Sequence, residues 1–113
     1  MEKLDEIELK VLEAIINENK TQFPFLVSHL SLLKVKSRES TGLGRYTNFE
    51  YIQEVSYHDV NTALASKNKL YINNLNFELA YEILISNGKI LYLEIVTNGN
   101  EEWYGNVDSF TFN

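Results

Sequence analysis

Hydrophobic residues recur at helical spacing near the start of the chain and alternate as in strands further on. The first pattern predicts an amphipathic helix over residues 2–19, whose apolar stripe consists of Leu4, Ile7, Val11, Ala14 and Ile15. Three further apolar residues widen the stripe: Leu9, Leu12 and Ile16. A stripe of this width either contacts a second element of its own chain or leaves a strip for a partner.

The clearest strand pattern lies in residues 77–97, where two apolar-rich runs meet at Asn87-Gly88. Asn-Gly between such runs predicts a β-hairpin with a two-residue turn. An unbroken register from this turn pairs Ile85 with Ile90, Ile83 with Tyr92 and Tyr81 with Glu94. Glu94 is then the one charged side chain on the core face. Glu82 lies on the other face, which argues against a hydrolase that uses these two carboxylates as a pair.

Residues 33–40 also alternate and predict a strand with a basic outer row, formed by Lys34, Lys36 and Arg38. A break at Gly42-Leu43-Gly44 leads into a strand over residues 45–52, so this region forms a second hairpin or a bulged turn.

Residues 23–33 fit either a short helix that begins at Pro24 or a strand from Val27. Residues 53–68 are expected to be a loop with one helical turn near 61–66, and short strands are expected at residues 70–75 and 110–112. Together these elements predict a single α+β domain over residues 1–113. Its N-terminal helix packs on an antiparallel sheet of about five or six strands.

The formal net charge of −6 argues against a nucleic-acid partner, because phosphate binding needs a basic surface, and it suits a basic protein partner. The chain contains no cysteine, which excludes disulfides and thiolate catalysis and fits a reducing cytoplasm. A signal peptide and an apolar run of membrane-spanning length are both lacking. We therefore expect a cytoplasmic protein without a membrane partner.

Candidate catalytic chemistry is sparse. Gly42-Leu43-Gly44 lacks the third glycine of a dinucleotide-binding loop, and the two histidines, His29 and His58, lack further donors for a metal. We expect no cofactor and no metal, and we favour a binding protein over an enzyme. A core-facing Glu94 would need a partner, for which a tyrosine hydroxyl, Arg38 or Arg45 are candidates. Such a group would be a structural ion pair or a site for an anion or small molecule.

The segment Glu101-Glu102-Trp103-Tyr104 holds the one tryptophan of the chain. Aromatic residues beside carboxylates are typical of protein-recognition patches, but they also close the end of a sheet as part of the core. Both interpretations stay open at the level of the sequence.

Three segments together resemble a family of small, poorly characterised bacterial α+β proteins: residues 37–44, the hairpin from Asn87 to Glu94, and Glu101-Glu102-Trp103. The resemblance runs from about Leu33 to Trp103, and the chain departs from it at Arg45, where an apolar residue is expected, and at Tyr104, where proline is expected. It implies a shared polar set, which consists of Arg38, Glu39, Glu94 and Trp103. Chains of this size and acidity are also similar to immunity proteins of bacterial toxin systems.

The sequence therefore favours an immunity-type protein that masks the active site of a basic toxin domain. The candidate contacts are Arg38, Glu39, Arg45, Glu94, Glu101, Glu102 and Trp103. The alternative is a domain, or weak enzyme, that binds a small molecule or anion through Glu94 with Arg38 or Arg45. A homodimer through the basic edge strand or the wide helix stripe is a third possibility.

Overall fold

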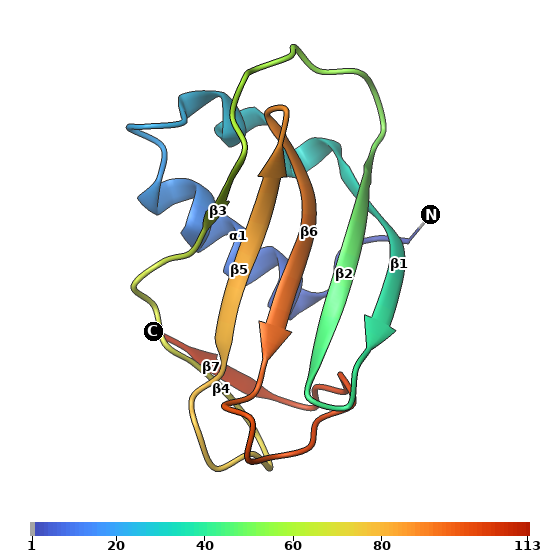
Figure 1. Cartoon of the computed structure of the whole chain (residues 1–113), viewed down its shortest axis with the longest axis vertical. Helices are drawn as coiled ribbons and strands as arrows, with labels where there is room; N and C mark the ends of the chain where they lie inside the picture. Colours follow the sequence, from blue (N-terminus) through green and yellow to red (C-terminus); the bar gives the residue numbers. More distant parts are fainter. Residues whose placement is uncertain (1) are drawn as a thin grey trace.

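A computed structural model describes residues 2–113 and shows one helix behind an antiparallel sheet (Figure 1). The helix is α1 (Glu6–Glu18). The sheet runs in the order β1 (Leu33–Ser40), β2 (Gly44–Tyr51), β6 (Lys89–Val96), β5 (Ala80–Ser86) and β3 (Thr62–Leu64). A second sheet pairs β4 (Leu70–Ile72) with β7 (Phe110–Phe112). The α+β prediction is confirmed, with the seven strands divided between two sheets.

Helix α1 begins later than its apolar pattern predicts, because Asp5 caps it. The Asp5 carboxylate accepts a hydrogen bond from the Glu8 backbone N–H at 2.9 Å, and the Glu8 carboxylate accepts one from the Asp5 backbone N–H at 2.8 Å. The inward side of the helix is buried through Ile7, Val11, Leu12, Ile15 and Ile16. The wide apolar stripe is therefore mainly used within its own chain, although Leu9 is 38% exposed.

The central hairpin turns at Asn87 and Gly88, as predicted, with positive φ angles of 51° and 80°. The pairing of Ile85 with Ile90 is also confirmed, but the register then shifts by one residue. Tyr92 pairs with Leu84, and Glu94 pairs with Glu82. The predicted pairs of Ile83 with Tyr92 and of Tyr81 with Glu94 are wrong because Leu91 forms a β-bulge, and a one-residue slip moves every later side chain to the opposite face.

A second register shift lies in β1, between Val35 and Ser37. It turns Arg38 towards α1, so the predicted basic outer row does not continue to Arg38. The bulge residue Lys36 is exposed, and the edge of β1 is partly covered by the N-terminal segment, since Glu2 pairs with Val35. Both bulges have the same effect: they reverse the inside and outside positions that strict alternation predicts.

The structure decides between the two interpretations of residues 23–33 and differs from the prediction at two other places. Residues 23–33 fold into two short 3₁₀ helices, η1 (Pro24–Ser28) and η2 (Leu30–Leu32), which supports the helical interpretation. The helical turn expected near 61–66 is wrong, because β3 occupies this position at the sheet edge. Phe77, the first residue of the predicted hairpin, is 51% exposed and precedes β5. Within residues 2–113, no helix has the length and apolar character needed to cross a membrane.

Candidate functional site

The inner side of the sheet holds a buried ion cluster centred on Glu8, whose side chain is fully buried. Arg38 reaches its carboxylate with two hydrogen bonds, from Nε at 2.8 Å and from Nη2 at 2.9 Å. Thr47 Oγ1 donates at 2.7 Å, and Arg45 Nη2 lies 3.4 Å away. We call Asp5, Glu8, Arg38, Arg45 and Thr47 the Glu8 cluster.

The Glu8 cluster keeps its central carboxylate ionised. Burial alone would raise the pKa of Glu8, but hydrogen bonds from Arg38, from the Asp5 backbone and from Thr47, together with the charge of Arg45, hold this pKa below its ordinary value. Arg45 is itself 7% exposed; it bonds the Gly105 carbonyl at 3.0 Å, and its Nε finds no acceptor within residues 2–113. The cluster therefore joins α1 to β1, β2 and the C-terminal loop.

The predicted combination of Glu94 with Arg38 or Arg45 is not formed. Both arginines face α1 and bind Glu8, whereas Glu94 lies on the opposite face of the sheet. The sequence does contain a signal for Glu8 that the helix prediction did not use. Leu4, Val11 and Leu12 stand four before, three after and four after it, which places this acid inside the apolar stripe.

The opposite side of the sheet, which faces the viewer in Figure 1, is an aromatic and acidic surface. We call it the outer face and define it by Glu39, Tyr46, Asn48, Glu82, Leu84, Tyr92 and Glu94. Cross-strand pairs line these residues up in two rows: Glu39, Tyr46, Glu94 and Glu82 in one, and Asn48, Tyr92 and Leu84 in the other. Apart from exposed Glu39, each of them is half-buried rather than sealed in the core.

Glu82 and Glu94 are the most unusual pair on the outer face, because they are like charges in directly opposed positions. Among residues 2–113, no lysine, arginine or histidine forms an ion pair with either of them. Tyr46 lies beside Glu94, and its hydrogen bond to that carboxylate raises the pKa of Tyr46 to about 12. The Tyr46 and Tyr92 rings meet edge to face at 5.3 Å.

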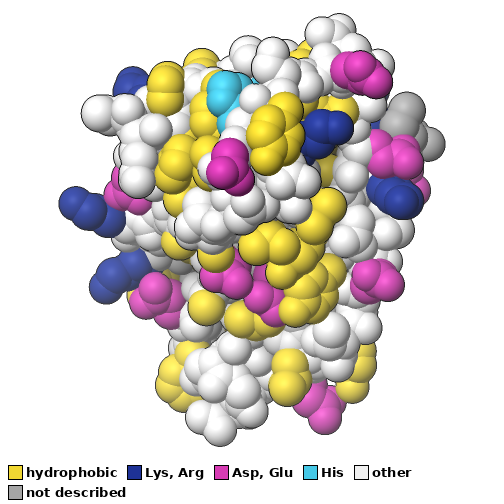
Figure 2. Space-filling view, turned by 45° about the horizontal axis from the view of Figure 1, so that its top comes forward, with side chains coloured by type: hydrophobic (Ala, Val, Ile, Leu, Met, Phe, Trp, Pro, Cys, Tyr) yellow, Lys and Arg dark blue, Asp and Glu magenta, His cyan; other side chains and the backbone are white. Residues whose placement is uncertain are grey.

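In the space-filling view, hydrophobic side chains surround adjacent carboxylates in the middle of the molecule, while Lys and Arg side chains lie along the left and in the upper part of the view (Figure 2). The bulge residue Leu91 extends the apolar part, since it is 46% exposed. This arrangement suits contact with a cationic surface: tyrosine faces attract cations, and carboxylates pair with them.

The remaining predicted contacts are divided between structural and exposed positions. Glu101 accepts hydrogen bonds from the backbone N–H groups of Asn76 and Phe77, at 2.8–3.1 Å, and so fixes a loop. Trp103 is 4% exposed, and its indole donates to the Asn106 carbonyl at 2.8 Å. Within the segment of residues 101–104, the side chain of Glu102 is exposed. The structure thus supports the core interpretation of Trp103.

Glu39 and Glu102 remain accessible. Glu39 lies on the outer face and accepts a hydrogen bond from Asn48 at 3.0 Å, while Glu102 accepts one from the hydroxyl of exposed Tyr104 at 3.1 Å. Of the predicted contact residues, Glu39 and Glu94 therefore lie on the outer face, whereas Arg38 and Arg45 belong to the Glu8 cluster.

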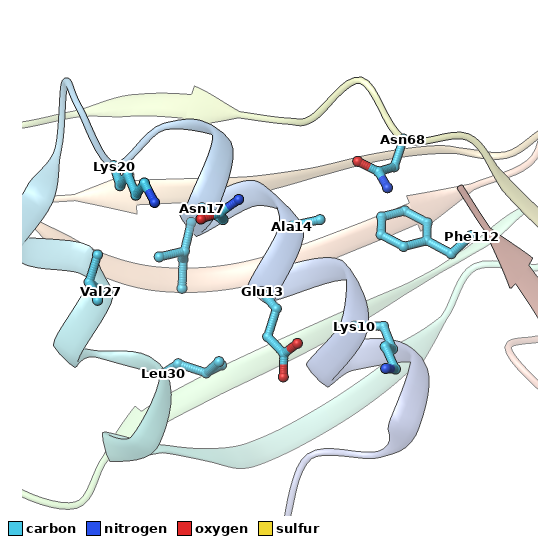
Figure 3. A pocket seen from close by; sticks show the side chains of 10 residues that line it. Lys10, Glu13, Ala14, Asn17, Lys20, Val27, Leu30, Asn68 and Phe112 are labelled. Carbon is cyan, nitrogen blue, oxygen red and sulfur yellow. The ribbon is translucent and has the colours of Figure 1, made fainter.

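A separate groove of about 590 Å³ runs between α1, the two 3₁₀ helices and β7 (Figure 3). Its apolar lining includes Val27, Leu30 and Phe112, and Lys10, Glu13 and Lys20 line it as well. The charges are of mixed sign, so this groove selects less clearly for one kind of partner than the outer face does.

Comparison of the chain with protein-family models, with curated proteins and with solved structures finds no match.

Proposed function

We propose that this chain is a small protein-binding inhibitor of the immunity type, which uses the outer face to cover a basic surface on a toxin domain. The observation that carries the proposal is the opposed pair Glu82 and Glu94, which lies beside the contact between the Tyr46 and Tyr92 rings and forms no ion pair with a basic residue in residues 2–113. Two carboxylates without a basic partner, next to aromatic rings, complement an arginine- or lysine-rich surface.

The physical setting of the outer face supports binding over catalysis. The sheet beneath it is held by the apolar core and by the Glu8 cluster, so the side chains project from a rigid support. A pre-ordered surface loses little conformational entropy on association. The net charge of −6 accelerates the approach of a basic partner.

The alternative anion or small-molecule site lacks its basic component on this face. Arg38 and Arg45 use their guanidinium groups on Glu8 and on other groups of the inner side. An anion at Glu94 would meet the second carboxylate, Glu82, at the opposed position. We therefore favour a cationic protein partner.

A growth-protection assay tests this proposal. The products of the genes that flank the gene for this chain are expressed singly in a heterologous bacterium, with and without the chain. We expect one product to arrest growth and the wild-type chain to restore it. If none arrests growth, or if the chain fails to restore growth against one that does, the inhibitor function is wrong.

A further inference from the structure

The segment between β2 and β3, residues 52–61, crosses the end of the sheet beside the central hairpin turn (Figure 1). Its ends are held by backbone groups: Ile52 donates to Leu32 at 2.9 Å, and Gly88 donates to Val60 at 3.0 Å. Between these points most side chains are exposed, and Tyr57 is 68% exposed. The middle of the segment therefore depends on a few side-chain contacts.

His58 supplies such a contact. Its ring stacks on the ring of Phe25 in η1, with centroids 3.8 Å apart and planes inclined by 9°. Its backbone also packs closely on the hairpin, because a Cβ added at Gly88 would lie 2.8 Å from the His58 Cβ. His58 thus connects the segment both to η1 and to the turn of the central hairpin.

His29 also contacts the Phe25 ring, edge to face with centroids 5.8 Å apart, and is 4% exposed. Its Nδ1 is 2.9 Å from the Tyr51 hydroxyl oxygen, which also accepts the Ile90 backbone N–H at 2.8 Å. One arrangement has the Tyr51 O–H donating to His29 Nδ1 while the Tyr51 oxygen accepts from Ile90. His29 is then a neutral imidazole with its proton on Nε2.

A proton on Nδ1 would turn this acceptor into a donor and leave the Tyr51 O–H without its acceptor. It would also add a positive charge in an unfavourable setting. Burial, His58 and Lys89 all lower the pKa of His29. Lys89 lies over the Tyr51 ring, with Nζ 5.8 Å from the centroid.

The acidic groups near this site lie at its margin. Glu54 lines the cleft of about 500 Å³ that also contains His29 and His58, and Asp59 follows His58 in the chain; both carboxylate side chains belong to exposed residues. Neither forms an ion pair with a histidine among the described residues. Protonation of both imidazoles would therefore place two like charges against the one Phe25 ring.

We propose that His29 and His58 form a pH-responsive latch, which holds residues 52–61 against η1 and the central hairpin when both imidazoles are neutral and releases the segment on protonation. The latch requires no ligand and is independent of the proposed inhibitor function. It makes the order of one loop depend on pH while the sheet stays folded.

Amide hydrogen exchange of the wild-type chain at about pH 7.5 and about pH 5 tests the latch, after correction for the intrinsic pH dependence of exchange. We expect the protection of Val60 and its neighbours to be lost at the lower pH. Core amides such as that of Leu93 should keep their protection from exchange at the lower pH. Equal loop protection at both pH values, or parallel loss in loop and core, would overturn the proposal.

The double variant His29→Asn/His58→Phe separates protonation from packing. Asparagine offers a hydrogen-bond acceptor near the position of Nδ1, and phenylalanine retains the stack on Phe25, but neither side chain takes up a proton. We expect the exchange protection of residues 52–61 in this variant to be independent of pH. A loss of protection at the lower pH like that of the wild type would overturn the latch.

Nitrogen-15 shifts of the wild-type imidazoles give a second measurement that needs no variant. Protonation of His29 or His58 must coincide in pH with the loss of loop protection. Loop opening at a pH where both rings remain neutral would also overturn the proposal.

Discussion

Glu94 stands directly opposite Glu82 on the neighbouring strand, so that two carboxylates occupy one cross-strand pair in the middle of the outer face. Opposed like charges destabilise a sheet, and no basic residue among residues 2–113 forms an ion pair with either acid. A cationic partner would relieve this repulsion. The Glu82–Glu94 pair thus lowers the stability of the sheet but favours the proposed binding of a cationic partner.

The first prediction concerns that repulsion. Glu94→Gln should raise the free energy of unfolding by about 0.2–1 kcal/mol, because it removes one of two opposed charges without changing the size of the side chain. Chemical denaturation at low salt measures the effect, and high salt should reduce it. Glu13→Gln, at an exposed position on α1, is the matched control and should change stability less. A loss of stability in Glu94→Gln would contradict the repulsion.

The second prediction concerns Tyr46, whose pKa is raised to about 12 by its interaction with Glu94. In the variant Glu94→Gln, this pKa should move down towards its ordinary value of 10.0. Ultraviolet absorbance titration detects the ionised ring, and the same titration of Tyr46→Phe identifies the contribution of this residue. An unchanged Tyr46 titration in Glu94→Gln would show that the two side chains do not interact.

The third prediction concerns the Glu8 cluster. Glu8→Ala should lower the free energy of unfolding by about 3–5 kcal/mol, because it leaves two arginine charges without their shared carboxylate. The triple replacement Glu8→Leu/Arg38→Met/Arg45→Met should be less damaging, because it removes the charges together. Thermal and denaturant unfolding compare the two variants. The account of the cluster is wrong if the triple variant loses the sum of its single effects.

The fourth prediction follows from the lowered pKa of Glu8. The unfolded chain binds a proton at this carboxyl near its ordinary value of 4.5, whereas the folded chain binds it at lower pH. The stabilisation is therefore complete above 4.5 and is lost as pH falls through the folded pKa. Unfolding free energies measured below about pH 5 should fall less steeply in Glu8→Gln than in the wild type. Parallel curves would contradict the assignment.

The sequence predicted the fold well where local patterns dominate. Asn87-Gly88 fixes the hairpin turn, and the helical spacing from Ile7 to Ile16 fixes α1, because each signal is contained in a few neighbouring residues. The α+β class follows from those elements. The structure differs from the predicted helix only at its boundary, because Asp5 caps the first turn of α1.

The candidate site was predicted less well because two β-bulges reverse the strand faces. The bulge at Leu91 moved Glu94 from the expected core face to the same face as Glu82, and the bulge at Lys36 turned Arg38 towards Glu8. A bulge depends on pairing with another strand, so strict alternation within one strand does not reveal it. The hydrogen bonds that Glu8 makes with Arg38 and Thr47 likewise join residues thirty or more positions apart.

The most direct test of the outer face is the rate of association with the growth-arresting product of a flanking gene. The variant Glu82→Lys/Glu94→Lys should bind about tenfold more slowly or worse at low salt, since it replaces attraction with repulsion at the centre of the surface. The matched variant Glu13→Lys/Asp108→Lys has the same change in net charge on other parts of the molecule. It should bind at close to the wild-type rate. Equal rates for the two variants would contradict the assignment of the outer face as the binding surface.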